Sequence, residues 1–230
     1  GSFQFMDTTR MRTWAEIDLS ALEHNYRTLR AMLPQDCRFL GLCKANAYGH
    51  GAAVIGHTLE RLGADMLAVA CVSEAEELRQ SGVTLPILCL GETPEELIPL
   101  LLELDVTQMV EDLETGRKLS AAAQRAGRTL KIHVKLDTGM SRLGFLWEAG
   151  REEETADEIA RLCRLPGLAA EGLFTHFADA DGSEAYTMAQ FDRFLAARAA
   201  LEERGIAFKI CHCASSAAVL QYPCTYLDMV

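Results

Sequence analysis

The sequence predicts an α/β fold, a TIM-type (β/α)8 barrel, and three observations support this class. Short apolar runs alternate with amphipathic segments along the chain of 230 residues, a pattern typical of parallel strands joined by helices. Eight such runs occur, and eight strand-helix units favour a closed barrel over an open doubly wound sheet. No Gly-x-Gly-x-x-Gly turn follows any run, which argues further against a dinucleotide-binding sheet.

The individual elements follow from this alternation. An amphipathic segment at residues 19–33 is expected to form a helix before the first strand, and Ser73 with Glu76 predicts a capping box at the start of a later helix. The apolar runs predicted to be strands are 39–44, 66–72, 86–91, 106–111, 130–136, 168–176, 208–214 and 225–230. The segments predicted to be helices between them are 51–62, 73–80, 94–104, 112–125, 151–163, 186–204 and a short 215–220.

The chain is expected to hold one folded domain. Residues 1–10 are interpreted as a tail, because Gly1 to Met6 looks like an added leader ahead of a natural Met6 or Met11. Residues 11–230 then form the barrel, which we expect to be incomplete at its C-terminal end because the sequence stops at the last predicted strand. No linker or low-complexity segment divides this range.

Composition and charge exclude several classes of protein. The chain is 49% hydrophobic and 24% charged, which is ordinary for a soluble globular protein. A net charge of −11 argues against a general nucleic-acid partner, because such binding needs an excess of lysine and arginine. No run approaches the roughly 20 apolar residues that span a bilayer, and no signal pattern opens the chain. We therefore expect a cytoplasmic protein without a membrane partner.

The eight cysteines do not predict a disulfide framework. Cys43, Cys71, Cys89 and Cys211 lie inside apolar runs, where small thiols pack as hydrophobic side chains and are expected to be buried and reduced. Strand alternation would send His212 to the face opposite its two cysteine neighbours. No metal site is predicted there.

The most informative motif is Lys-Ala-Asn-Ala-Tyr-Gly-His-Gly at residues 44–51, directly after the first apolar run. Lys44 thus stands where a buried strand opens into a glycine-containing loop. A lysine amine beside apolar residues loses solvation, which favours its neutral, nucleophilic form and suits it to bind a carbonyl cofactor. Tyr48 is close enough along the chain to reach an anion. A lysine that merely points to water at the strand end is the alternative.

Other polar side chains are expected to gather near Lys44. In a parallel barrel the chemistry occurs at the carboxyl ends of the strands. The fifth predicted strand leads into a loop that carries Arg142, and the sixth ends at His176. The seventh contains His212 and leads to Ser216. These residues should therefore meet at one mouth of the barrel.

The fifth strand has one polar and one apolar face. Lys131, His133 and Lys135 alternate with Ile132, Val134 and Leu136. The apolar face should contact the helices, so the polar face should point into the barrel, where a buried lysine needs a partner or a modification. For Lys131 and His133, contact with water at the barrel ends is an equally open alternative.

Together these motifs resemble the alanine racemase family of fold-type III pyridoxal-phosphate enzymes. The resemblance starts at Trp14-Ala15-Glu16-Ile17-Asp18 and continues to the end of the chain. Besides residues 44–51 it rests on Lys-Leu-Asp-Thr-Gly-Met-Ser-Arg-Leu-Gly at 135–144 and on Thr-His-Phe-Ala at 175–178. It implies a barrel domain followed by a mainly β domain that this sequence does not contain.

The resemblance implies roles for catalytic residues. Lys44 would hold pyridoxal 5'-phosphate as a Schiff base and act as one of two acid-base groups. Arg142 would approach the phenolic oxygen of the cofactor and the substrate carboxylate, where a planar fork of donors is useful. His176 would lie against the cofactor ring. Lys135 matches a position that some members carry as a carbamate, which would orient Arg142.

It also implies residues that only bind the cofactor. Tyr48 and Ser216 would bind the phosphate, the latter with help from a helix N-terminus, and His212 would belong to a hydrogen-bond network beneath the ring. The family usually has asparagine before this serine, whereas the chain has Ser215. Serine also caps helices, so we expect little effect.

The implied activity is racemisation of L-alanine and D-alanine, which supplies D-alanine for peptidoglycan. The second base, a tyrosine, and an arginine at the pyridine nitrogen would come from beyond Val230, and the active site would be shared between the subunits of a homodimer. The fragment alone is expected to be inactive. Two alternatives remain: a serine/alanine racemase domain of a glycopeptide-resistance protein, and a single-barrel pyridoxal-phosphate carrier without catalysis. A purely structural barrel is a third, weaker alternative.

Overall fold

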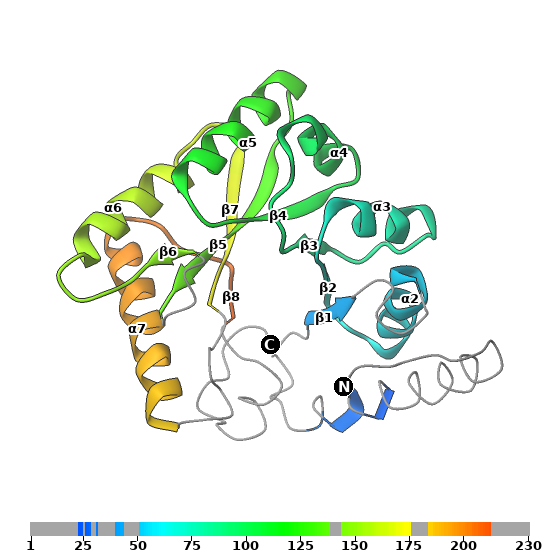
Figure 1. The fold of residues 1–230 in the computed structure, drawn as a ribbon, viewed down its shortest axis with the longest axis horizontal. Helices are drawn as coiled ribbons and strands as arrows, with labels where there is room; N and C mark the ends of the chain where they lie inside the picture. Colours follow the sequence, from blue (N-terminus) through cyan, green and yellow to red (C-terminus); the bar gives the residue numbers. More distant parts are fainter. Residues whose placement is uncertain are drawn as a thin grey trace.

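The chain folds into a curled parallel sheet covered on its outer side by helices (Figure 1). The computed structural model describes residues 23–24, 26–28, 31, 40–43, 51–138, 144–175 and 184–212. In Figure 1 the helices follow one another in an arc around the strands, which lie at the centre. This arrangement is a TIM-type α/β barrel sheet, as the sequence predicted.

The strands pair in parallel, and their order follows the chain. Within the described part of the chain the path is β1-β2-β3-β4-β5-β7-β8, and β6 pairs separately with the end of β5. The short β6 was not predicted from the sequence. The strands are β1 (Leu40–Cys43), β2 (Met66–Val69), β3 (Ile87–Cys89), β4 (Val106–Val110), β5 (Leu130–Asp137), β6 (Phe145–Leu146), β7 (Leu168–Phe174) and β8 (Ile210–His212).

Each described connection between consecutive barrel strands contains a helix, as expected for parallel neighbours. Of the predicted helix at 19–33, the described residues 23–24, 26–28 and 31 are helical. The predicted helix at 215–220 and strand at 225–230 lie outside the described residues. The remaining helices are α2 (Ala52–Leu62), α3 (Val72–Gln80), the 3-10 helix η1 (Glu95–Leu97), α4 (Ile98–Glu103), α5 (Leu113–Ala126), α6 (Glu152–Cys163) and α7 (Glu184–Glu203).

Helix boundaries show where local sequence rules succeed and where they fail. The Asp112 side chain accepts a hydrogen bond from the Thr115 N–H at 2.7 Å and so begins α5 as a good N-cap should. The predicted Ser73–Glu76 capping box is wrong, because α3 begins at Val72 and Ser73 already lies inside it. The carboxylate that serves this helix start is Glu74, which accepts the Ala70 N–H at 2.8 Å.

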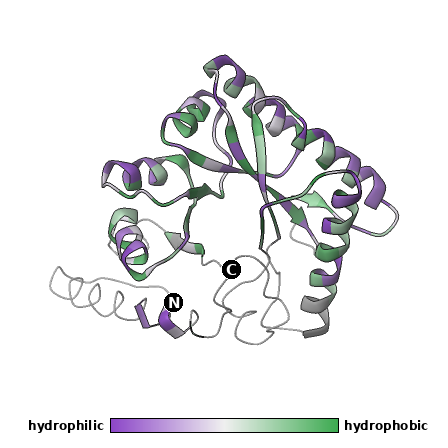
Figure 2. Ribbon diagram, turned by 180° about the vertical axis from the view of Figure 1, so that it is seen from behind, coloured by the Kyte–Doolittle hydropathy of each residue, from purple (hydrophilic) through white to green (hydrophobic). Residues whose placement is uncertain are grey.

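The core has an outer and an inner part. The outer core lies between helices and sheet and includes Ile132, Val134 and Leu136, all at most 1% exposed. The inner core fills the concave side of the sheet and is built on Met66, Leu88 and Ile210, with Leu40 and Leu90 packed against them. In Figure 2 the hydrophilic colour lies mainly on the helices, while the strands are mostly hydrophobic. The predicted outward direction of the apolar face of β5 is thereby confirmed.

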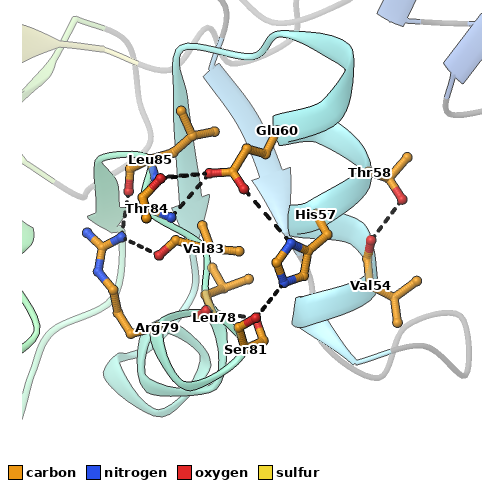
Figure 3. Close-up of polar contacts among 10 residues, drawn as sticks. All are labelled: Val54, His57, Thr58, Glu60, Leu78, Arg79, Ser81, Val83, Thr84 and Leu85. Carbon is orange, nitrogen blue, oxygen red and sulfur yellow. Dashed lines mark hydrogen bonds and ion pairs between the residues drawn. The ribbon is translucent and has the colours of Figure 1, made fainter.

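A polar network fixes the connection from α3 to β3 (Figure 3). Arg79 Nη1 donates to the Val83 and Leu85 carbonyl oxygens at 3.0 and 2.7 Å. Glu60 of α2 accepts the backbone N–H groups of Thr84 and Leu85 at 3.2 and 3.3 Å. This network lies where β3 begins, so it stabilises the end of the barrel opposite the carboxyl ends of the strands.

Three of the four cysteines assigned to apolar runs are buried free thiols. Burial raises the pKa of Cys43 to about 12, and Cys89 and Cys211 are also buried. Cys71 is exposed, contrary to the prediction, because β2 ends at Val69 and Cys71 is already the N-cap of α3. No helix in the described ranges is long and apolar enough to cross a membrane.

Candidate active site

Only part of the predicted site can be described. Lys44, Tyr48, Arg142, His176 and Ser216 lie outside the described residues. Lys135 is described in full, and His212 is described as the last residue of β8, without its side chain. The strands that precede these residues in the sequence are described, up to their carboxyl ends.

The carboxyl ends of these strands lie at one edge of the sheet. Lys135 of β5 is paired in register with Phe174 of β7, and Phe174 is paired with His212 of β8. These three residues therefore form a row across adjacent strands. Cys43 ends β1 at the same edge of the parallel sheet, directly before Lys44.

Lys135 points into the barrel mouth and has a carboxylate partner there. Its side chain is 13% exposed, and its Nζ lies 3.9 Å from Glu111 Oε1. Glu111 follows directly after β4. Burial raises the pKa of Glu111, and the neighbouring Lys135 opposes this shift. The predicted need of Lys135 for a partner is thus met by a residue that sequence reasoning did not single out. A carbamate on Lys135 stays a prediction.

The middle of the polar face of β5 is buried. His133 is fully buried, and its Nε2 lies 3.6 Å from Glu171 Oε1 of β7. A Cβ on Gly172 would lie 2.6 to 2.7 Å from three atoms of the His133 ring, so the ring lies directly over this glycine. A hydrogen bond from the His133 ring to the Glu171 carboxylate holds the pKa of that carboxyl below its ordinary value. Contact of His133 with water is therefore excluded.

Lys131, at the other end of the same face, is exposed, as its alternative interpretation allowed. It lines a cavity of about 260 Å³ together with Glu171, Lys209, Thr107 and Arg79. This cavity lies at the amino ends of the strands, the end of parallel barrels that normally carries stability and not chemistry.

The ends of β5 and β7 are joined by contacts that the sequence did not reveal. The Thr138 and Thr175 hydroxyl groups are 3.0 Å apart and buried. Arg193 of α7 donates from Nη1 to the Thr138 carbonyl oxygen at 2.8 Å. Thr175 directly precedes His176, and Thr138 opens the loop that contains Arg142.

Possible metal ligands do not cluster within the part of the chain that the structure describes. No group of three or more His, Cys, Asp or Glu side chains there could hold an ion. The described polar residues at the mouth are a lysine, a carboxylate and two hydroxyl groups, all of which can form hydrogen bonds.

A parallel α/β barrel sheet with polar residues at the carboxyl ends of its strands is the architecture of a barrel enzyme. The family model described as "Alanine racemase, N-terminal domain" matches residues 17–230. The chain belongs to the alanine racemase family.

Individual relatives agree with this assignment. The chain is 44% identical to an alanine racemase of Desulforamulus reducens over 218 residues, covering 94% of this chain and 58% of the relative. It is 45% identical to an alanine racemase of Desulfovibrio desulfuricans, covering 94% and 57%. The chain thus spans a little under three fifths of the length of these curated relatives.

Solved structures give the same result. The alanine racemase of Clostridium difficile 630 superposes with a TM-score of 0.85 at 40% identity, covering 91% of this chain and 57% of that one. An alanine racemase of Bacillus anthracis with bound L-Ala-P gives 0.82 at 33% identity, covering 92% and 54%.

Proposed function

We propose that the protein is a pyridoxal-phosphate-dependent alanine racemase and that residues 11–230 form its cofactor-binding barrel domain. The observation that carries the proposal is the position of Lys44. It directly follows β1 at the carboxyl edge of the sheet, the edge that also holds the row of Lys135, Phe174 and His212.

The described surroundings fit a cofactor held by a lysine amine. Cys43, the last residue of β1, is completely buried, so Lys44 directly follows an apolar strand end in the sequence. The mouth also offers buried hydroxyl groups and a lysine paired with a carboxylate, which are polar groups of the kind that orient a small charged ligand.

Each side chain then has a separate task. Pyridoxal phosphate, when bound, supplies an electron sink for the carbon that loses its proton. Lys44 would hold the cofactor through Nζ and carry a proton to or from one face of the α-carbon. Arg142 would orient the substrate carboxylate with its planar fork of donors. The base for the opposite face would come from a C-terminal domain, as the family resemblance implies.

The remaining predicted residues would position the cofactor. Tyr48 and Ser216 would donate hydrogen bonds to its phosphate, and His176 and His212 would hold its ring. We further propose that the complete protein acts in the cytoplasm as a homodimer whose two active sites are shared between subunits, and that its D-alanine serves peptidoglycan synthesis.

The proposal is tested on the complete protein. Conversion of L-alanine to D-alanine is measured after addition of pyridoxal phosphate, and borohydride reduction with peptide mass mapping locates the modified lysine. We expect racemisation and a stable adduct on Lys44. Lys44→Ala should abolish both, whereas Lys118→Ala, on the exposed face of α5, should abolish neither.

Substrate choice is tested by the same assay with L-serine. Faster turnover of serine than of alanine would favour the serine/alanine racemase alternative. Cofactor labelling at Lys44 without turnover of either amino acid would favour the carrier alternative. No adduct on Lys44 would refute the proposal altogether.

A further inference from the structure

We propose that Thr138, Thr175 and Arg193 are positioning residues that fix the two segments carrying Arg142 and His176. This inference rests on the function proposed above, because it assigns these three residues to the same site. It concerns how the barrel orients groups that touch the ligand, and none of the three is assigned a chemical step.

The first observation is the hydroxyl pair. Backbone pairing between β5 and β7 extends to Lys135 and Phe174. Beyond that pair, the Thr138 and Thr175 hydroxyl groups lie 3.0 Å apart, and the two residues are only 1% and 3% exposed. A buried hydroxyl group must have a hydrogen-bond partner to avoid a large desolvation cost. The pair therefore joins the two strand ends where the backbone ladder stops.

The second observation is the arginine from α7. Its Nη1 donates to the Thr138 carbonyl oxygen at 2.8 Å, and hydrogen bonds from a charged donor are about twice as strong as neutral ones. The helix that carries Arg193 is anchored by its neighbour Phe194, which is completely buried, and by Phe191. Arg193 thus connects the start of the Arg142 loop to a fixed helix.

The third observation concerns Gly144 and β6, where the chain comes back beside the end of β5. Gly144 has a φ of +118°, and a Cβ there would lie 2.8 Å from the Lys135 carbonyl oxygen. Only glycine tolerates this conformation and this close approach. The chain then forms β6, and the Trp147 N–H donates to the Asp137 carbonyl oxygen at 3.0 Å. Figure 1 shows β6 beside the end of β5. Thr138 and Gly144, the described residues on either side of the Arg142 segment, are therefore both fixed by contacts.

This arrangement matters because His176 directly follows Thr175 and Arg142 follows Thr138 by four positions in the sequence. A guanidinium group that binds a carboxylate must be oriented in its plane, and a displacement of about 1 Å at a reacting centre can cost about 100-fold in rate. The hydroxyl pair couples the two segments to each other, and Arg193 couples them to the outer layer of the barrel.

The test uses three variants of the complete protein: the double variant Thr138→Val/Thr175→Val, Arg193→Met, and the control Arg198→Met. Valine keeps the shape of threonine, and replacing both partners leaves no unpaired hydroxyl, so the fold should be little affected. Arg198 lies on the same helix, and its Nε forms an ion pair with Glu202 Oε1 at 3.5 Å. Thermal midpoints are measured to confirm that each variant is folded.

We expect kcat for alanine to fall about tenfold or more in the two test variants while KM changes less than about threefold, because orientation in the transition state is lost. In the cofactor-free protein, amide hydrogen exchange of a peptide spanning residues 138–147 should be about fivefold faster or more. Arg198→Met should change neither quantity.

Unchanged kcat and unchanged exchange in folded test variants would overturn the inference, and so would equal effects in the control. The outcomes are separate from those of the proposed function. Failure of the natural protein to label at Lys44 or to racemise alanine contradicts the proposed function, while the exchange measurement still reports whether the three residues fix the loop.

Discussion

Replacing Gly172 by alanine should destabilise the barrel through a single contact. The added Cβ would lie 2.6 Å from His133 Nδ1 and 2.7 Å from Cε1 and Cγ of the same ring. His133 is completely buried and paired with Glu171, so the ring has little freedom to move away. Overpacking of this kind costs about 1–3 kcal/mol. The loss of chain entropy in the unfolded alanine variant returns about 0.4–1 kcal/mol, which leaves a net cost of up to about 2.6 kcal/mol.

A double-mutant cycle isolates this contact. The free energy of unfolding is measured by urea denaturation, followed by far-ultraviolet circular dichroism, for the natural protein, Gly172→Ala, His133→Ala and the double variant. Without the ring, the added methyl group fills part of the vacated space. Gly172→Ala should therefore be neutral or slightly stabilising in the His133→Ala background, which corresponds to a coupling energy of about 1–3 kcal/mol.

A control excludes a general effect of losing a glycine. A Cβ on Gly150 meets nothing within 4 Å, although the residue has a φ of +88°. Gly150→Ala should cost about the same in both backgrounds, because its penalty is conformational. If Gly172→Ala also costs the same with and without the His133 ring, the steric explanation is refuted.

Three further predictions follow from the described contacts. Glu171→Gln should lower the free energy of unfolding at neutral pH. The pKa of Glu171 is held below its ordinary value of 4.5, so the carboxylate stabilises the fold above about pH 4.5. In a pH series of urea midpoints, the difference between the variant and the natural protein should vanish as the pH falls through the folded-state pKa. Arg79→Met should cost about 2–4 kcal/mol in the same denaturation assay, because it removes hydrogen bonds to four backbone carbonyl oxygens; a midpoint equal to that of the natural protein would contradict this. Iodoacetamide at pH 8 should modify the exposed Cys71 before Cys43 and Cys163, as followed by peptide mapping. Burial raises the pKa values of Cys43 and Cys163 to about 12, so few of their thiols are ionised. Early modification of Cys43 in the folded protein would contradict its burial at the end of β1.

The sequence predicted the fold well because the periodicity of apolar residues carries that information. The eight residues of β5 show this most clearly, since the alternation of Ile132, Val134 and Leu136 with polar residues specified both the strand and the face that contacts the helices. Helix starts were less certain. Ser73 and Glu76 match a capping pattern, but the strand before them ends early enough for the helix to begin at Val72. The local rule identifies a suitable pair without fixing the position at which the turn occurs.

The candidate site was predicted only in part because its supporting contacts join distant residues. Thr138 and Thr175 are 37 positions apart, and Arg193 is 55 positions from the carbonyl group it binds. No local sequence pattern indicates contacts between residues so far apart in the chain. Glu111 gave a weak signal, since it follows the fourth strand next to the strand that carries Lys135. Recognising that signal required knowledge of which strands are neighbours.

The polar face of β5 has different surroundings at its two ends and in its middle. Lys131 reaches solvent at the amino end, His133 is buried against Glu171 of β7, and Lys135 is paired with Glu111 beyond β4. His133 and Lys135 thus each lie near a carboxylate, Glu171 of β7 for His133 and Glu111 after β4 for Lys135. Ion pairs of this kind are often no more stabilising than well-packed apolar residues of the same volume. The cluster of Met66, Leu88 and Ile210 on the other strands shows that the interior of this sheet can be apolar, so the presence of Lys135 at the carboxyl end of β5 supports the ligand site proposed above.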